Sequence, residues 1–290
     1  MESSNGSKRT TSSYGRGGAH SLFRRSGRGL GDLTDRAALV TGASGGLGAA
    51  IARRLHREGA HVVLTGRREG ELSALDAELG GKTRVVTADL ARLEDVQRLA
   101  EQADGVDILV ASAGLPANGD LADLSVEGIA RAVDINVRST LVLIRMLVPR
   151  MLQLGSGHVV IVGSLAGIAS TPRSSIYNAS KFALRGFGHA LHEELRGSGV
   201  GVSLISPTFV SETGMWADTG LRAHHAEVTP HQVVDACVEA IHTNRAEILV
   251  APRTQRLGVR MAGLFPELMQ PVLRSSVVPP EAVAAQQRKR

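Results

Sequence analysis

Three residues in the second half of the chain could move a proton. Tyr177 and Lys181 lie four positions apart, so they share one face of a helix if this segment is helical. An ammonium group beside a phenol favours the phenolate, and we therefore expect Lys181 to lower the pKa of Tyr177 from about 10. Ser164, thirteen positions before the tyrosine, adds a hydroxyl. The set predicts general acid–base chemistry centred on the phenol.

A glycine-rich stretch near the start of the chain could bind a phosphate. Residues 41–48 read Thr-Gly-Ala-Ser-Gly-Gly-Leu-Gly, between a short apolar run and a helical pattern. Gly42 permits a tight turn, Gly46 lets the backbone approach a pyrophosphate, and Gly48 allows close packing of the following helix. The N–H groups and the dipole at the start of that helix attract an anion. The stretch therefore predicts a nucleotide site.

The end of the next apolar run indicates which nucleotide binds. A carboxylate about 20 residues after the glycines would bind the ribose 2′-hydroxyl of NAD. Residues 65–68 instead read Thr-Gly-Arg-Arg, without an acid. Arg67 would pair with a 2′-phosphate, and Ser44 offers a hydroxyl donor, whereas Arg68 is expected to be solvated. NADP(H) is therefore expected in preference to NAD(H).

The elements that position these residues alternate along the chain. Seven short apolar runs are expected to be strands, and the segments between them have helical patterns. Such alternation predicts an α/β fold, a doubly wound parallel sheet of about seven strands with helices on both faces. The expected strands are 37–40, 61–65, 84–87, 107–110, 158–162, 201–205 and 247–250. The first expected helix follows the glycine-rich stretch and ends near residue 58. The other expected helices are 69–79, 92–103, 126–153, 176–196 and 230–243. No linker interrupts residues 35–251, so one domain is expected.

The glycine stretch and the tyrosine–lysine pair together resemble the short-chain dehydrogenase/reductase family. The resemblance rests on Thr41-Gly42-x-x-x-Gly46-x-Gly48 with Tyr177-x-x-x-Lys181, and it extends from about residue 36 to residue 252. It implies a single Rossmann-like domain that binds NAD(H) or NADP(H). It also implies hydride transfer between that cofactor and a carbonyl or a secondary alcohol.

The resemblance assigns four catalytic residues. Asn136 would hold a water in a proton relay, and Ser164 would bind the substrate oxygen. Tyr177 would act as the acid or base, and Lys181 would bind the nicotinamide ribose. These types suit the chemistry, because a carbonyl that accepts hydride develops negative charge on oxygen, which hydroxyl donors and a proton source stabilise.

Further cofactor contacts follow from the same resemblance. Asp89 would accept a hydrogen bond from the adenine amine, although it could instead cap the following helix. The remaining contacts are expected at Leu47, Leu90, Ala113, Gly114, Pro207 and Val210.

The chain departs from the family pattern in three places. Ala111-Ser112 replaces two asparagines, Thr208 replaces a glycine, and Glu212 stands where a threonine is common, with Thr213 one position later. These changes leave the geometry at the nicotinamide end open.

The two ends of the chain differ in composition from its body. Residues 1–34 carry six basic and two acidic side chains, residues 252–290 carry seven and two, and the body is left with a net charge of −4 in a chain of +5. We expect residues 1–34 to be a disordered basic tail. The glycines among these residues oppose the amphipathic helix of a transit peptide. Residues 252–290 are expected to be a partly ordered extension.

Composition also limits the partners. A net positive charge that is confined to the two ends, together with only 3% aromatic residues, argues against nucleic acid as a partner. One cysteine, Cys237, excludes a disulfide framework, no cluster has the spacing of metal ligands, and no apolar run is long enough to span a membrane. No secretory apolar core is found either, so a cytoplasmic location is expected.

Association and substrate are less constrained. The resemblance implies a homodimer or homotetramer, and it suggests that residues near His224 and His225 form a substrate lid. The substrate is expected to be a small carbonyl or alcohol, with a ketolipid, a steroid, a 3-oxoacyl thioester and a sugar-derived carbonyl all open. A non-catalytic NADP(H)-binding sensor or scaffold is the alternative function.

Overall fold

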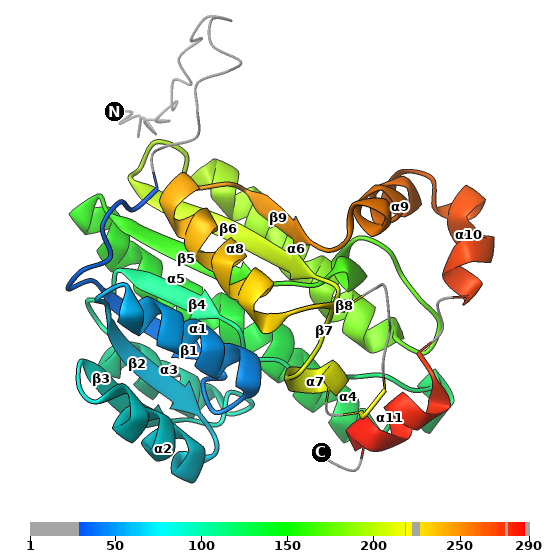
Figure 1. Cartoon of the computed structure of the whole chain (residues 1–290), viewed down its shortest axis with the longest axis horizontal. Helices are drawn as coiled ribbons and strands as arrows, with labels where there is room; N and C mark the ends of the chain where they lie inside the picture. The colour runs from blue at the N-terminus through cyan, green and yellow to red at the C-terminus, as the bar shows by residue number, and fades with distance from the viewer. Residues whose placement is uncertain (1–28, 218, 222–226, 276–277, 288–290) are drawn as a thin grey trace, which may run out of the picture.

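A parallel β-sheet forms the centre of the molecule (Figure 1). The computed structural model describes residues 29–217, 219–221, 227–275 and 278–287. Within them the sheet has seven strands in the order β3-β2-β1-β4-β5-β6-β9, and every neighbouring pair is parallel. The strands are β1 (Ala37–Thr41), β2 (His61–Gly66), β3 (Thr83–Thr87), β4 (Ile108–Ala111), β5 (Gly157–Val162), β6 (Val200–Pro207) and β9 (Glu247–Val250).

Helices cover both faces of this sheet, as Figure 1 shows. On one face lie α1 (Gly46–Arg57), α2 (Glu69–Leu79) and α8 (Pro230–Thr243). On the other lie α3 (Leu93–Gln102), α4 (Val126–Val133), α5 (Ser139–Leu154) and α6 (Ser175–Glu194). The predicted doubly wound α/β fold is therefore confirmed.

The strands are apolar because both of their faces are buried. In β1, Ala38 and Val40 belong to the core under α1 and α8, whereas Leu39 belongs to the core under α3 and α5. Successive side chains of a strand point to opposite faces, so a strand buried on both sides needs an uninterrupted apolar run. All residues of β5 and β6 are buried for the same reason.

The expected helix over residues 126–153 contains an irregular turn. A π-helical segment, η2 (Asp134–Arg138), joins α4 to α5. Ser125 caps α4 by accepting a hydrogen bond from the amide of Gly128. The π-turn shifts the helical phase by one residue, and such turns are frequent at functional sites.

Short elements surround the carboxyl ends of the strands. Two 3₁₀ turns, η1 (Leu121–Asp123) and η3 (Leu165–Gly167), follow β4 and β5. After β6 come β7 (Phe209–Val210), α7 (Gly214–Ala217) and β8 (Glu227–Val228), with β7 and β8 paired. His224 and His225, expected in a lid, lie outside the described residues.

The described ends of the chain pack on the body. Leu30 and Leu33, which the sequence assigns to the basic tail, are buried, and the amide of Leu30 donates to the carbonyl of Ile241 in α8 at 2.9 Å. Residues 1–28 of that tail lie outside the described residues. The C-terminal extension forms α9 (Arg253–Leu264), α10 (Pro266–Ser275) and α11 (Pro280–Gln287). No helix in the described part of the chain is long and apolar enough to cross a membrane.

Candidate active site

Most of the sequence-predicted residues follow the carboxyl ends of the strands, on both sides of the point where the strand order reverses. This point lies between β1 and β4: the strands that follow β1 in the chain are added on one side of it, and those that follow β4 on the other. Ligands of open α/β sheets bind at such a point, beyond the carboxyl ends of the strands. The Thr41 hydroxyl at the end of β1 accepts hydrogen bonds from the amides of Ser112 and Ala113, each at 3.1 Å. These hydrogen bonds hold the loop after β1 against the loop after β4.

The glycine loop between β1 and α1 is closely packed. Gly42 has a φ of +73°, and a Cβ there would lie 3.0 Å from the Cα of Ala113. A Cβ on Gly48 would lie 2.3 Å from the carbonyl oxygen of Gly42, so only glycine fits. Leu47 packs against the core. The loop thus brings its backbone to the start of α1.

The first turn of α1 has the donors that a phosphate requires. Gly45 is the N-cap and provides no side-chain cap, and the turn contains no acidic residue. The first amides of a helix have no partner within the helix, and its dipole favours an anion. These residues fit the pyrophosphate of a dinucleotide.

Two arginines follow β2 beside this loop. A Cβ on Gly66 would lie 2.5 Å from the Ser44 Oγ, so Ser44 covers the end of β2. Arg67 is exposed and forms no hydrogen bond or ion pair with the described residues. Arg68, expected to be solvated, instead donates to the carbonyl of Ser44 and pairs with Glu71 at 3.0 Å. Arg68 therefore holds the glycine loop in place, whereas the guanidinium of Arg67 is exposed and has no partner among the described residues.

Asp89 follows β3 and is held by an arginine. Its carboxylate accepts from the amide of Ala91 at 3.1 Å and pairs with Arg131 of α4 at 3.1 Å. Arg92, not Asp89, is the N-cap of α3, so the alternative of a helix cap does not apply. Leu90 is buried in the core between α3 and the sheet. Arg131 could not be predicted as the partner of Asp89 from the sequence, because the two residues lie 42 positions apart.

Ser164 and Tyr177 come together from two consecutive elements. Ser164 follows β5 and caps η3, and its Oγ accepts from the amide of Ala166 at 3.1 Å. Tyr177 lies in the first turn of α6, close enough for the Ser164 hydroxyl to act on the pKa of its phenol. The turn η3 and the start of α6 are in extensive contact, which fixes this pair.

The acidity of Tyr177 differs from the sequence expectation. Burial raises the pKa of Tyr177 above its ordinary value, and the hydrogen bond from Ser164 opposes this rise in part. Lys181, expected to lower the tyrosine pKa, has its Nζ 5.7 Å from the ring centroid. That Nζ donates to the carbonyl of Val162 at 2.9 Å. Desolvation therefore outweighs the lysine, and the phenol is protonated at neutral pH.

Lys181 itself is perturbed by its surroundings. Its side chain is buried, and burial lowers its pKa to about 8. A charged group in a desolvated site loses hydration, so its neutral form gains relative stability.

Asn136 is fully buried in the π-helical segment. Its Oδ1 accepts from the amide of Leu115 at 2.7 Å, and its Nδ2 donates to the carbonyl of Leu115 at 3.0 Å and to the Ser180 Oγ at 3.2 Å. The Ser180 hydroxyl in turn donates to the carbonyl of Tyr177 at 2.7 Å. Asn136 therefore ties the loop after β4 to α6. Ser180 was missed from the sequence, where only its place between Tyr177 and Lys181 marks it.

Gly114 lies where these groups meet. A Cβ there would lie 3.5 Å from the Asn136 Oδ1, 3.9 Å from the Lys181 Nζ and 3.3 Å from the Met215 Cε of α7. A Cβ on Gly46 would overlap the Oγ1 of Thr213. The segment 213–215 thus lies against both glycine segments, and Met215 has no marker in the sequence.

The last predicted contacts follow β6. Pro207 is buried at the end of that strand, and Val210 of β7 packs against the core. Thr208, which replaces a glycine, donates its amide to the carbonyl of Val250 at 3.1 Å. Next to it Phe209 packs on Trp216, with ring centroids 4.2 Å apart.

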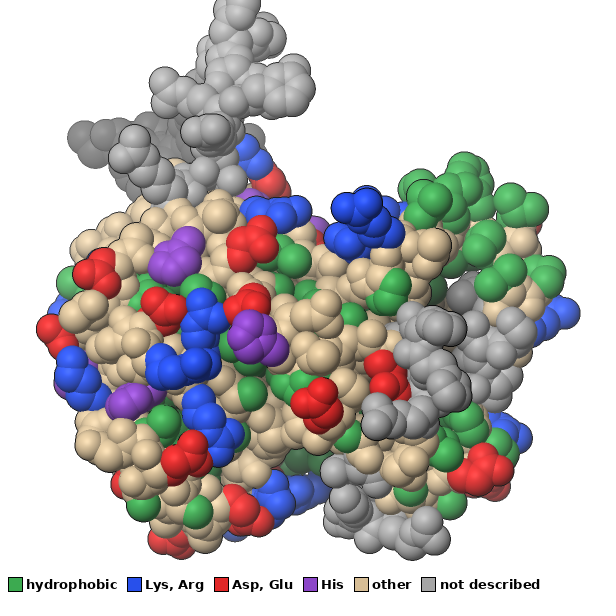
Figure 2. Space-filling model, viewed as in Figure 1, with side chains coloured by type: hydrophobic (Ala, Val, Ile, Leu, Met, Phe, Trp, Pro, Cys, Tyr) green, Lys and Arg blue, Asp and Glu red, His purple; other side chains and the backbone are tan. Residues whose placement is uncertain are grey.

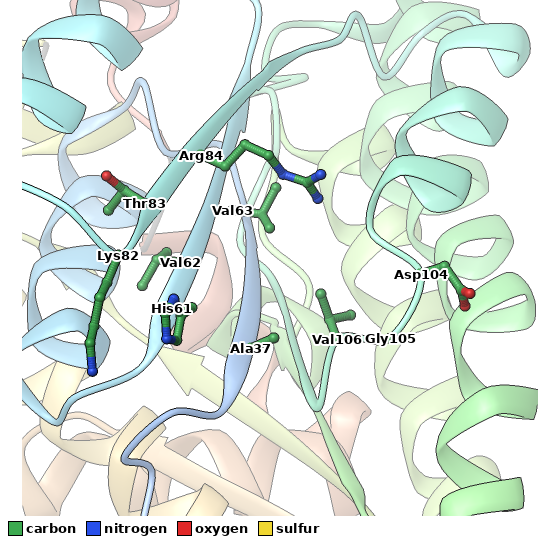
Figure 3. A pocket seen from close by; sticks show the side chains of 10 residues that line it. All are labelled: Ala37, His61, Val62, Val63, Lys82, Thr83, Arg84, Asp104, Gly105 and Val106. Carbon is green, nitrogen blue, oxygen red and sulfur yellow. The ribbon is translucent and has the colours of Figure 1, made fainter.

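A separate pocket of about 270 Å³ lies at the opposite edge of the sheet (Figure 3). It is lined at the amino ends of β1, β2 and β3, among others by His61, Lys82 and Arg84. Lys82 pairs with Asp35 at 2.7 Å, and Arg84 donates to the carbonyl of Gln102. This pocket contains none of the predicted residues. The described residues also contain no group of three potential metal ligands.

Comparisons with known proteins agree with this geometry. The family model described as short chain dehydrogenase matches residues 36–224. The ketoacyl reductase HetN of Nostoc is 36% identical over 228 residues, covering 75% of this chain and 79% of that protein.

Solved structures with bound cofactor share the fold. The closed form of a serine dehydrogenase complexed with NADP⁺ aligns with a TM-score of 0.69 and 29% identity, over 76% of this chain and 96% of that one. A 3-oxoacyl (acyl-carrier-protein) reductase of Agrobacterium tumefaciens with NADP bound aligns with a TM-score of 0.68 and 27% identity, over 75% and 93%. The chain therefore belongs to the short-chain dehydrogenase/reductase family, as an oxidoreductase with a nucleotide cofactor.

Proposed function

We propose that this protein is an NADP(H)-dependent enzyme that interconverts a small carbonyl compound and a secondary alcohol, with Tyr177 as proton donor and acceptor. The observation that carries the proposal is the closeness of the Ser164 and Tyr177 hydroxyls to each other, with the buried Lys181 Nζ 5.7 Å from the tyrosine ring centroid. Two hydroxyls so placed can both donate to one substrate oxygen.

In the reductive direction these hydroxyls stabilise negative charge. Hydride addition to the carbonyl carbon turns its oxygen into an alkoxide, and Ser164 and Tyr177 donate hydrogen bonds to it. Tyr177 then transfers its proton to that oxygen, which yields the alcohol. Because burial raises the pKa of Tyr177, the phenol enters the reaction protonated at neutral pH. The bound cofactor supplies the hydride.

Lys181 and Asn136 support proton transfer by the phenol of Tyr177. Below about pH 8 Lys181 carries a proton, so its ammonium can donate to a ribose hydroxyl and favour the tyrosinate after proton transfer. Asn136 fixes the carbonyl of Leu115 and, through Ser180, the first turn of α6. We propose that Lys181 and Asn136 return a proton to Tyr177 through a bound water.

The glycine loop and its neighbours would hold the cofactor. The amides at the start of α1 suit the pyrophosphate, and Arg67 with Ser44 suits the 2′-phosphate of NADP. NADP is also the cofactor named for the serine dehydrogenase and the Agrobacterium reductase. The remaining contacts are assigned to Leu47, Asp89, Leu90, Ala113, Gly114, Pro207 and Val210.

We also assign the enzyme to the cytoplasm as a homodimer or homotetramer. Val133, Leu154 and Phe182 are exposed on α4, α5 and α6, where contact with a second copy would cover them. Sedimentation equilibrium measures the mass, and a monomer at micromolar concentration would contradict this assignment.

A screen of carbonyl classes with NADPH tests the function. Ketolipids, steroids, 3-oxoacyl thioesters and sugar-derived carbonyls are each incubated with the enzyme, and NADPH oxidation is followed with NADH in a parallel series. The proposal predicts turnover in at least one class and faster turnover with NADPH. Tight NADPH binding without turnover in any class would instead indicate a sensor.

A further inference from the structure

The outer surface of α9 and α10 exposes a group of large apolar side chains. We call it the α9–α10 face, and it consists of Leu257, Leu264, Phe265, Leu268 and Val272, each between 52 and 71% exposed. Figure 2 shows hydrophobic side chains gathered over this part of the molecule. Isolated exposed leucines are ordinary, but a contiguous group of this kind marks an interaction surface.

The opposite side of α9 is fixed on the body. Val259 and Ala262 are buried in a small core with Leu165 and Ile168. A Cβ on Gly263 would lie 3.1 Å from the Ile168 Cγ2, so the helix is closely seated. Residues three and four apart share one side of a helix, so the buried pair leaves Leu257 and Leu264 directed outward. The apolar side chains cannot turn inward without losing this core.

Arginines accompany the exposed apolar residues. Arg253, Leu257, Arg260 and Leu264 recur at helical spacing along one side of α9. The side chains of Arg253, Arg256 and Arg260 form no hydrogen bond or ion pair with the described residues. Residues 253–275 contain four arginines and a single acid, Glu267. The face is therefore apolar and cationic at once.

We propose that the α9–α10 face binds the surface of a bilayer that contains anionic lipids. An interfacial helix buries apolar side chains among the acyl chains near the headgroups, while its cations pair with anionic headgroups. None of the described helices could cross the membrane, so the attachment is peripheral. A symmetric contact with a second copy would bring the same unpaired arginines together, and like charges oppose such an interface. None of the five residues of this face belongs to the proposed active site, and the inference does not depend on the reaction.

Vesicle binding of the full-length chain tests the proposal. The protein is sedimented with vesicles of phosphatidylcholine alone and of phosphatidylcholine with about one-third phosphatidylglycerol, across a range of salt. We expect binding to the anionic vesicles that is at least tenfold stronger than to neutral ones and that weakens as salt rises. Leu264→Ser with Leu268→Ser should reduce it at least tenfold.

Matched control variants distinguish binding by the α9–α10 face from nonspecific effects of exposed apolar side chains or of positive charge elsewhere on the protein. Leu121→Ser with Val126→Ser removes two apolar side chains that are 60 and 76% exposed elsewhere, and this variant should bind like the wild type. Arg253, Arg256 and Arg260 changed together to Gln should abolish the preference for anionic vesicles. The same change at Arg57, Arg92 and Arg145, which are exposed on other helices or loops, should preserve it. Thermal unfolding and NADPH binding confirm that each variant is folded.

Three results would overturn the proposal. Wild-type protein that fails to bind anionic vesicles contradicts it directly. Equal binding by the leucine variant would place the attachment elsewhere, for example in the basic N-terminal residues. Self-association without vesicles that the same leucine changes abolish, together with absent vesicle binding, would identify the face as an interface between copies.

Discussion

The pairing of Ser164 with Tyr177 is the residue-scale feature on which the proposed chemistry depends. Spacing in the sequence predicted which side chains meet, since four positions on a helix place Tyr177 and Lys181 on one face. Spacing did not predict the direction of the tyrosine pKa, because that depends on how far the phenol is desolvated by distant segments. The lysine ammonium is also engaged by the carbonyl of Val162, which no local pattern reveals.

The cofactor preference is argued at a single arginine. Arg67→Asp should weaken NADPH binding by about tenfold to a hundredfold, because a charge-assisted contact to the 2′-phosphate is replaced by repulsion. NADH binding should be unchanged or improved. Fluorescence titration of both cofactors measures the change, with Arg57→Asp as a control for an exposed arginine outside the site. Equal loss for NADPH in the control, or no loss at Arg67, would show that Arg67 does not contact the phosphate.

At the scale of elements, the glycine loop and the π-turn position the site. The sequence located the loop because a turn, a close approach and a helix start each need glycine at a defined place. It did not locate the π-turn at Asp134–Arg138, since a π-turn depends on tertiary contacts rather than on propensity. The buried bonds of Asn136 to Leu115 and Ser180 are such contacts.

The close packing of the loop predicts a marked effect of one methyl group. Gly48→Ala should reduce NADPH affinity at least tenfold and lower the free energy of unfolding by about 1–3 kcal/mol, because its Cβ would meet the carbonyl of Gly42 at 2.3 Å. Gly70→Ala in α2 has open space around it and should raise stability by about 0.5–1 kcal/mol. Denaturant unfolding and NADPH titration give both quantities. Wild-type affinity in Gly48→Ala would show that the loop can relax.

At the scale of the whole molecule, burial determines what the sequence could and could not predict. The seven strands and the helices between them followed from short apolar runs, which are uninterrupted because both faces of the sheet are covered. The burial of Leu30 and Leu33, with Leu30 bonded to α8, was not predicted, since two leucines among glycines and serines form no periodic pattern. Residues 252–290 were expected to be a partly ordered extension, and the sequence did not indicate the helices α9 and α10 within it.

The buried histidine of the central sheet predicts acid sensitivity of the whole fold. Burial, followed by the nearby His192 and His242, lowers the pKa of His158 to about 3, and its Nε2 lies 3.0 Å from the Ser203 Oγ. Between pH 6.5 and 3 the unfolded chain binds a proton that the folded chain does not. The contribution is thus fully present above about pH 6.5 and is lost as the pH falls. At about pH 4.5 the loss amounts to about 3 kcal/mol.

A comparison of two histidine variants measures this contribution. Urea unfolding at pH 7 and at about pH 4.5 should show that His158→Asn loses about 3 kcal/mol less on acidification than the wild type. His61→Asn, an exposed change on β2, should retain the wild-type slope. If wild type, His158→Asn and His61→Asn all lost the same free energy of unfolding between pH 7 and about pH 4.5, the role of His158 would be contradicted.

Turnover by a Tyr177→Phe variant tests the central claim most directly. Once the carbonyl screen has found a substrate, wild type, Tyr177→Phe and Ser175→Ala are compared, the last removing an exposed hydroxyl from the same turn of α6. We predict that Tyr177→Phe lowers kcat by about 10²–10⁴ while NADPH affinity stays within about threefold, because only the proton donor is removed. Ser175→Ala should match the wild type. Wild-type turnover by Tyr177→Phe would contradict the assignment of Tyr177 as the proton donor.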